Sequence, residues 1–124
     1  DLDRKKISIG QTLQINQLFF TADSSVINPE SYAVLDEIYD FLSKNNDVVI
    51  EIGGHTNSIP PPEYCDRLST ARAKNVAEYL KEKGIIADQV QYKGYGKRVP
   101  IASNETAAGR LKNQRVELKI ISMK

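Results

Sequence analysis

The chain alternates between segments with the two-residue period of strands and segments with the longer period of helices. "TLQINQLFF" (12–20) predicts a strand, and "VVIEI" (48–52) predicts a short β-branched strand that ends at the following Gly-Gly pair. "QVQYKGYG" (89–96) predicts a third strand that runs into a glycine turn. The fourth, "QRVELKII" (114–121), alternates cleanly, with three apolar residues on one face: Val116, Leu118 and Ile120.

Helices are predicted between these strands. The first begins at "NPE" (28–30), where Asn28 can cap the helix and Pro29 takes the first helical position. It continues to about Asn45, and "SNETAAGRLKN" (103–113) predicts a shorter helix within a loop. The apolar residues of the first helix recur at helical spacing: Leu35, Ile38 and Leu42.

A second long helix is predicted from about Asp66 to Lys83, where Gly84 stops it. One stripe of this helix is small at its start and bulky at its end, so the start is expected to lie very close to the sheet. The stripe consists of Ser69, Ala73, Val76, Ala77 and Leu80.

The predicted order is β-α-β-α-β-(α)-β. Two βαβ-like crossovers place both main helices on the same side of the sheet. We therefore predict an α/β (α+β) two-layer sandwich, in which a mixed four-stranded sheet is covered on one face by two main helices. Hydrophobic residues make up 40% of the chain and charged residues 27%, which is typical of a globular domain, and residues 1–124 are interpreted as a single domain.

Charge and hydropathy exclude several kinds of partner. The net charge of +1 provides neither a basic field for nucleic acid nor a polybasic patch for a membrane. No apolar run approaches the roughly 18 residues of a membrane span, so no direct insertion into a membrane is expected. The opening Asp1-Leu2-Asp3-Arg4 is charged, unlike a signal peptide, and we interpret the chain as a domain excised from a longer protein.

The stretch "GGHTNSIPPPEYCDRLSTARA" (53–73) holds the only histidine and the only cysteine, His55 and Cys65. A cysteine nucleophile needs an imidazole within reach, a group that orients the ring, and oxyanion donors, and nothing in the sequence indicates that these converge. We interpret Cys65 as a small, semi-buried residue at a helix start and His55 as hydrogen-bonded to the backbone. A closed zinc site takes four ligands. The sequence therefore predicts no catalytic residue, no metal site and no cofactor.

Arg72 lies beside the apolar stripe, near the start of the predicted helix, where the helix dipole disfavours a cation. An anionic partner in front of the guanidinium explains this placement. Two partners remain open from the residues alone. One is a ligand carboxylate, which arginine binds bidentately; the other is a structural salt bridge with Asp66 or Asp23.

Three segments resemble the OmpA-like C-terminal domain family. "GHTNSIPPPEYCDRLSTARAKNVAEYL" (54–80) is similar to its pattern of GHTD, a turn, and N-x-x-LS-x-x-RA-x-x-V-x-x-YL. "FFTADSSVINPESYAVLDEI" (19–38) resembles its opening strand, loop and first helix. "VQYKGYGKRVPIASNETAAGRLKNQRVEL" (90–118) resembles its G-x-G, P-I, N-x-T, GR and N-R-R-V-E signature. The resemblance extends from about Leu13 to Ile121.

The resemblance implies a non-catalytic domain that binds peptidoglycan non-covalently in the periplasm of a diderm bacterium. Members of the family contact the diaminopimelate residue of the stem peptide and anchor a larger protein to the cell wall. That parent would be an outer-membrane barrel, a lipoprotein, or a component of a motor or secretion apparatus. The chain is also similar to variants at the C-terminus of multidomain envelope proteins of Bacteroidetes.

In the family, the Asp of GHTD takes the ligand's ammonium and the Arg of LS-x-x-RA takes its carboxylate. Carried over, the arginine is Arg72, while Asn57 stands where the family has aspartate; Asp23 would supply a negative charge if it faces the pocket. Thr56-Asn57 and Arg72 are expected at the same end of the sheet. The ligand-binding residues implied are Ala22, Asp23, Thr56, Asn57, Leu68, Ser69, Arg72 and Arg115.

Three residues depart from the family pattern. Asn57 lacks the charge of aspartate, Cys65 stands where the family has Asn, and Gln114 stands where it has the first Arg of N-R-R-V, of which Arg115 retains the second. Two other functions therefore remain open. One is a protein-interaction module that has lost ligand binding through Asn57, and the other is an enzyme that uses Cys65 and His55.

Overall fold

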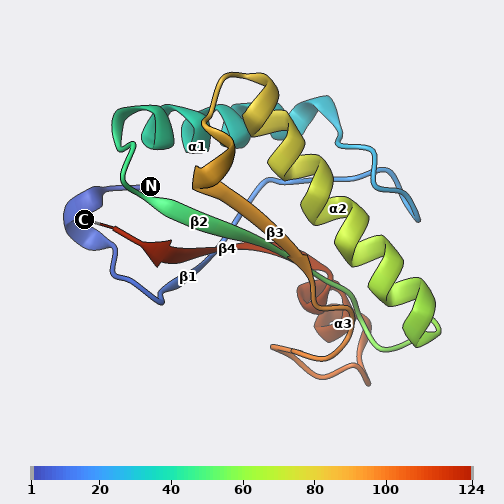
Figure 1. The fold of residues 1–124 in the computed structure, drawn as a ribbon. Coiled ribbons are helices and arrows are strands. Elements are labelled where there is room, and N and C mark those ends of the chain that lie inside the picture. The colour runs from blue at the N-terminus through green and yellow to red at the C-terminus, as the bar shows by residue number, and fades with distance from the viewer. Residues whose placement is uncertain (1, 124) are drawn as a thin grey trace.

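The computed structural model describes residues 2–123, and Figure 1 shows a sheet with two long helices packed above it. The strands are β1 (Thr12–Gln14), β2 (Val49–His55), β3 (Val90–Gly94) and β4 (Arg115–Ser122). The helices are α1 (Tyr32–Lys44), α2 (Pro62–Glu82) and α3 (Ala107–Asn113). Short 3₁₀ turns lie at Arg4–Lys6, Pro29–Ser31 and Ala87–Gln89.

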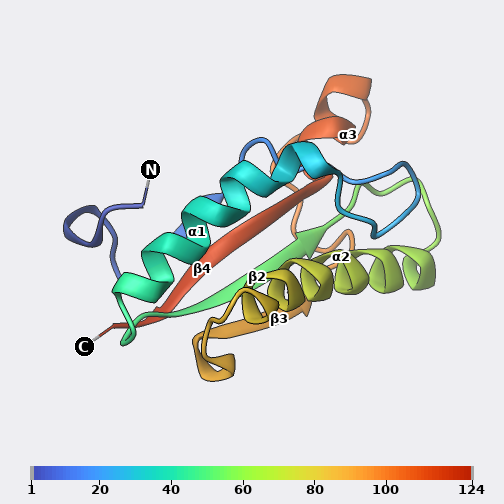
Figure 2. The ribbon, with the colours of Figure 1, turned by 90° about the horizontal axis from the view of Figure 1, so that it is seen from above.

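The sheet has the strand order β1-β4-β2-β3. β4 runs antiparallel to both of its neighbours, and β2 runs parallel to β3. β1 and β2 therefore point the same way, so the chain makes two β-α-β crossovers, one through α1 and one through α2. Figure 2 shows both helices on the same side of the sheet. The predicted two-layer sandwich with a mixed four-stranded sheet is confirmed.

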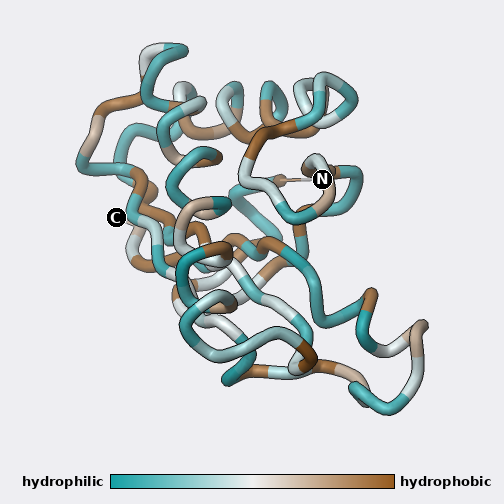
Figure 3. The backbone as a smooth tube through the Cα atoms, turned by 90° about the vertical axis from the view of Figure 1, so that its right-hand side faces the viewer, coloured by the Kyte–Doolittle hydropathy of each residue, from teal (hydrophilic) through white to brown (hydrophobic). Residues whose placement is uncertain are grey.

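The core lies between α1, α2 and the sheet face that they cover. Alternate residues of β2 and β4 point toward the helices because side chains on a strand alternate between its two faces. Figure 3 shows apolar positions interleaved with hydrophilic ones along the backbone. The buried residues include the predicted ones of α1 and β4 together with two from β2: Leu35, Ile38, Leu42, Val116, Leu118, Ile120, Ile50 and Ile52.

The first half of α2 lies very close to the sheet, as its small residues predicted. A Cβ atom built on Gly54 of β2 would lie 2.1 Å from the carbonyl oxygen of Ser69. One built on Gly94 of β3 would lie 2.5 Å from the backbone nitrogen of Thr70. Only glycine permits this approach of two backbones. All five residues of the predicted stripe are fully buried: Ser69, Ala73, Val76, Ala77 and Leu80.

Two strands differ from their predicted bounds. β1 occupies only the first residues of the predicted segment 12–20, since Gln17 adopts a φ of 62° and ends the extended backbone. β2 does not stop before its two glycines. It continues through Gly53 and Gly54 to His55 because these residues pair with both β3 and β4.

The helix starts also differ. α2 begins at Pro62, a full turn earlier than predicted, and proline suits this first turn because it needs no N–H there. Asn28 occupies the N-cap position of the turn opened by Pro29, but its side chain makes no capping hydrogen bond. α3 is shorter than the predicted 103–113, since Thr106 accepts a hydrogen bond from the backbone of its first turn and caps it.

We predict that Gly54→Ala will destabilise the domain by about 3 kcal/mol, because the new methyl group would overlap a helix carbonyl that cannot move alone. Gly10→Ala is the matched control. Its Cβ would meet nothing within 4 Å, so only the positive φ of 87° is strained, by about 1–2 kcal/mol. Urea unfolding measures both changes. Equal, small losses would show that α2 can move away from the sheet without penalty.

Candidate functional site

A pocket of about 310 Å³ lies where the segment before α1, the loop after β2 and the side of α2 meet. Its lining comes from these three segments and from the end of α3. Six of the eight predicted ligand-binding residues line it: Ala22, Asp23, Thr56, Asn57, Leu68 and Arg72. The expected convergence of Thr56-Asn57 and Arg72 at one end of the sheet is therefore confirmed.

Arg72 lies midway along α2, not near its start, because the helix begins at Pro62. Contrary to the prediction, the helix dipole does not disfavour a cation here, since its effect is limited to the first turn. The half-buried guanidinium lies 4.8 Å from the centre of the Phe20 ring. Burial lowers the pKa of Arg72, and the neighbouring Tyr64 and Asp23 act in the opposite direction.

The guanidinium of Arg72 also holds the loop that precedes α1. Its Nε donates to the carbonyl oxygen of Ser24 at 2.8 Å, and Nη2 donates to that of Thr21 at 3.5 Å. Asn75, one turn further along α2, donates to the carbonyl oxygen of Ser25 at 2.7 Å. A guanidinium has five N–H groups. Both hydrogens on Nη1 and one on Nη2 therefore remain for a ligand.

Neither aspartate considered as a partner forms an ion pair with Arg72 within the described residues. Asp66 pairs instead with Arg98, whose Nη1 lies 2.7 Å from Oδ1. Asp23 lines the pocket, and its Oδ1 accepts the hydroxyl of Tyr64 at 3.1 Å. The prediction of a structural salt bridge is therefore wrong. Arg72 lines the pocket, and its N–H groups that do not bind loop carbonyls are available to a ligand.

Asn57 lies two residues after the end of β2 and is only 8% exposed. Its Oδ1 accepts the backbone N–H of Ile59 at 2.9 Å, and its carbonyl oxygen accepts the hydroxyl of Thr56 at 2.9 Å. A backbone N–H can only donate, so this bond fixes which side of the amide is oxygen. The NH2 group of Asn57 is consequently the part of the side chain that remains for other contacts.

Two predicted ligand-binding residues lie outside the pocket lining. Ser69 is fully buried; its Oγ donates to the carbonyl oxygen of Asp66 at 3.2 Å and accepts from the N–H of Gly96 at 3.0 Å. Arg115 lies on the sheet face away from the helices, with its Nε 2.8 Å from Glu117 Oε2. The structure does not bring these two residues to the pocket, and their contacts indicate structural roles.

His55 also points to the sheet face away from α2, because it alternates with Gly54. Its Nε2 lies 3.2 Å from Glu117 Oε1, and its ring stacks on Tyr95 with 4.9 Å between centroids. The predicted hydrogen bond to backbone is wrong, since a carboxylate takes its place. Burial, followed by the positive charge of Arg115, lowers the pKa of His55 to about 4, against the opposing effect of Glu117.

Cys65 is fully buried in α2, deeper than the semi-buried position predicted. Its Sγ lies 3.7 Å from the carbonyl oxygen of Asn57 and 3.5 Å from that of Pro60. Cys65 and His55 thus use different partners on different sides of β2. Within residues 2–123, no group of three or more histidine, cysteine or acidic side chains is placed to hold a metal ion.

Sequence reasoning missed seven residues of the pocket lining. Several are aromatic or aliphatic, and the adjacent pair Phe19-Phe20 before the loop was a signal that could have found two of them. Tyr64 had no such signal, because its contact with Asp23 joins two distant segments. The residues are Leu18, Phe19, Phe20, Pro60, Tyr64, Leu111 and Gln114.

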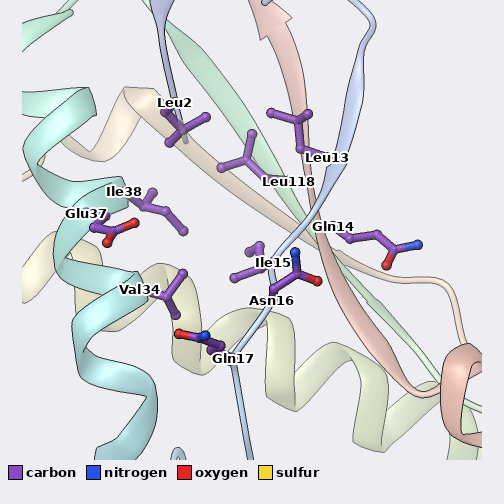
Figure 4. A pocket seen from close by; sticks show the side chains of 10 residues that line it. All are labelled: Leu2, Leu13, Gln14, Ile15, Asn16, Gln17, Val34, Glu37, Ile38 and Leu118. Atoms are coloured by element: carbon purple, nitrogen blue, oxygen red, sulfur yellow. The ribbon is translucent and has the colours of Figure 1, made fainter.

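A larger pocket, of about 600 Å³, lies between α1 and the β1 segment. Figure 4 shows Leu2, Val34 and Ile38 on one side of it and Leu13 and Ile15 on the other. Glu37 is the one charged residue of its lining. None of the predicted ligand-binding residues reaches it, whereas six of them line the smaller pocket, which we take as the candidate site.

Residues 19–114 match the sequence profile of the OmpA family. This match covers most of the chain and includes every element that forms the pocket. The chain belongs to the OmpA family. Like other members whose structures are solved, it is an α+β domain with a mixed four-stranded sheet, so the resemblance on its sequence motifs is confirmed.

Three relatives illustrate the range of the family. The peptidoglycan-binding protein ArfA of Mycobacterium tuberculosis is 37% identical over 101 residues, which are 82% of this chain and 31% of that protein. The periplasmic domain of Helicobacter pylori MotB is 30% identical, with a TM-score of 0.77 over 93% of this chain and 78% of that one. The cell wall anchor of the T6SS from Pseudomonas aeruginosa is also 30% identical, with a TM-score of 0.74 over 88% and 78%. The chain spans between 12% and 53% of the length of the curated relatives that it matches.

We predict that the free energy of unfolding falls as the pH drops from about 6.5 to about 4. The unfolded chain protonates His55 near its ordinary pKa of 6.5, whereas the folded chain does so only near a pKa of about 4. The unfolded state therefore binds more protons in this window, and the loss approaches about 3 kcal/mol at its acid end.

Chemical denaturation at a series of pH values measures this loss. His55→Gln, which keeps a donor for Glu117 but does not titrate, is the control and should lose most of the pH dependence above pH 4. Carboxylates such as Asp36, whose pKa Lys83 lowers, contribute in both proteins. An unchanged profile in His55→Gln would show that the folded domain tolerates a charged His55.

Proposed function

We propose that this domain binds peptidoglycan non-covalently through the pocket around Arg72 and so anchors a larger envelope protein to the cell wall. The observation that carries the proposal is the half-buried Arg72 guanidinium, which lines the pocket without a carboxylate partner among the described residues. Relatives whose names record peptidoglycan binding or cell wall anchoring support the ligand class. A half-buried guanidinium that still has unused N–H groups is suited to bind a carboxylate.

The finer proposal is that the ligand is the diaminopimelate end group of the stem peptide. Its carboxylate would lie against the unused N–H groups of Arg72, and the remainder of the end group would lie toward Thr56 and Asn57. The pocket volume of about 310 Å³ is near the lower limit of ligand pockets, which suits one amino-acid end group better than a sugar chain.

The proposed location is the periplasmic cell envelope, with a parent protein in or at the outer membrane. Within residues 2–123, no helix is long and apolar enough to cross a bilayer. The relatives include an outer membrane porin and a motility protein, so the parent's other domains differ across the family. An origin in Bacteroidetes stays a prediction from the sequence.

We predict that Arg72→Ala abolishes sedimentation with insoluble peptidoglycan while the domain stays folded. Loss of a guanidinium from a desolvated carboxylate weakens binding by about 2–5 kcal/mol. Arg67→Ala is the charge-matched control, because Arg67 is an exposed arginine of the same helix that does not line the pocket. Sedimentation assays and circular dichroism measure binding and folding.

A second control separates the two roles of Arg72. Asn75→Ala removes a hydrogen bond to the same loop without removing a charge, so it should bind nearly as well as the unchanged domain. Equal losses in Arg72→Ala and Asn75→Ala would mean that the loop position, and not the cation, governs binding. A failure of the unchanged domain to sediment with peptidoglycan would favour the protein-interaction module.

We further propose that the domain is not an enzyme. Cys65 is buried against two backbone carbonyls, and His55 is bound to Glu117 on the other side of β2, which supports structural roles for both. Cys65→Ala should therefore bind peptidoglycan as the unchanged domain does, with neither releasing soluble muropeptides. A muropeptide-releasing activity that disappears in Cys65→Ala, measured by chromatography of the digest, would overturn this proposal.

A further inference from the structure

We propose that the pocket selects a carboxylate whose neighbouring nitrogen is acylated, in preference to a free zwitterionic amino acid. This inference rests on the proposed function and specifies which form of the end group is bound. Arg72 would take the carboxylate, and the NH2 group of Asn57 would donate to the acyl carbonyl. In peptidoglycan this chemistry occurs where a side-chain amine of one stem peptide is joined to another stem, and at the C-terminus of a stem.

The orientation of the Asn57 amide determines which group the residue offers to a ligand. The backbone N–H of Ile59 donates to Oδ1 at 2.9 Å, so the oxygen side of the amide faces the turn that follows Asn57. No described residue accepts a hydrogen bond from Nδ2. Nδ2 is not sealed away from solvent either. Within residues 2–123, His55 Nδ1 is the one buried side-chain nitrogen or oxygen that lacks a hydrogen-bond partner. The NH2 group of Asn57, a residue of the lining, is therefore open to the pocket.

An open NH2 group selects acceptors. An ammonium carries three donors and no acceptor, so a free amine placed beside Nδ2 would face another donor and leave its own hydrogens unpaired. An acylated amine offers a carbonyl oxygen instead, which Nδ2 can bind. Leaving a donor unpaired in a partly buried site costs more free energy than one neutral hydrogen bond contributes.

Thr56 suits the remaining N–H of such an amide. Its hydroxyl hydrogen is used in the bond to the carbonyl oxygen of Asn57, which leaves the lone pairs of Oγ1 to accept. A secondary amide needs one acceptor there, and an ammonium needs three. Gln114, also in the lining, adds a second neutral amide and no charge.

Asp23 is the one acidic side chain of the lining and the natural competitor for an ammonium. It is exposed, and its Oδ1 already accepts the hydroxyl of Tyr64 at 3.1 Å. Water screens a carboxylate in this position, so it attracts an ammonium less than a buried one would. Asp23 therefore does not outweigh the donor presented by Asn57.

The rim of the pocket can hold what an acyl group adds. Phe19 and Leu111 both line the pocket, and they are 47% and 71% exposed. Large apolar side chains at a pocket edge bury the carbon atoms of a ligand that extends out of it. An acyl group on the nitrogen adds carbon atoms that this rim can cover, and a free amine adds none.

Calorimetric titration with two synthetic stem tripeptides tests the inference. Both end in diaminopimelate, one with its distal amine free and the other with that amine acetylated. The acetylated form should bind the unchanged domain about fivefold more tightly, the value of one neutral hydrogen bond. N-acetyl-D-alanyl-D-alanine, titrated alongside, distinguishes a cross-link from a stem C-terminus as the source of the acylated carboxylate.

Asn57→Asp is the matched variant. A carboxylate keeps the acceptor that the Ile59 N–H requires and replaces only the NH2 group, so the loop should stay in place while the preference reverses toward the free amine. Arg67→Ala, at an exposed residue of α2 outside the pocket lining, should leave the preference for the acetylated form unchanged. Tighter binding of the free amine by the unchanged domain, or the same preference in Asn57→Asp, would overturn the inference.

The inference and the proposed function fail in different ways. If the domain sediments with peptidoglycan but prefers the free amine, or binds none of the three ligands, only the inference is wrong. If it neither sediments nor binds any of them, the proposed function is wrong.

Discussion

The close contact between α2 and the sheet is the constraint on which the site depends. Gly54 and Gly94 let the helix backbone approach to a distance that any Cβ atom would block. Ser69 then closes the contact, because its hydroxyl accepts the N–H of Gly96 and ties the helix to the loop after β3. With α2 held at this depth, the residues that leave β2 pass directly beside its side, and the pocket forms between them.

Arg72 has two roles that depend on each other. It is half-buried without an acidic partner among the described residues, and such a cation needs compensation. Two loop carbonyls and the face of Phe20 provide part of it and at the same time fix the loop that forms the pocket wall. Dipoles, a ring and the exposed carboxylate of Asp23, which does not pair with Arg72, leave the charge only partly compensated, whereas a carboxylate in direct contact would have neutralised it.

The two faces of the sheet separate the residues that looked reactive. His55, Glu117 and Arg115 form a paired cluster on the face away from the helices, where burial and Arg115 keep the imidazole neutral. Cys65 lies within α2, with its Sγ against the carbonyl oxygens of Asn57 and Pro60. Strand alternation turns His55 away from the side of β2 that faces α2, so closeness in sequence does not bring His55 and Cys65 together.

Periodicity in the sequence determined most of the fold. The alternation of Val116, Leu118 and Ile120 and the small-to-bulky stripe of α2 each reflect a repeating environment, which a local pattern can report. Segment ends were less predictable: β2 passes through two glycines because pairing with two neighbours outweighs their weak strand preference, and β1 ends where Gln17 turns.

The sequence by itself also determined six of the residues that line the pocket, with Thr56, Asn57 and Arg72 in one place as their motifs implied. It misplaced Ser69 and Arg115, because a motif gives the order of residues and not the face on which each one points. Only the tertiary structure decided that Arg72 has no acidic partner among the described residues and that Asn57 presents its NH2 group. Both depend on contacts with backbone groups. Arg72 binds a carbonyl of a loop far away in the sequence, and Asn57 binds an N–H of the turn that follows it. The identity of a side chain does not specify such contacts.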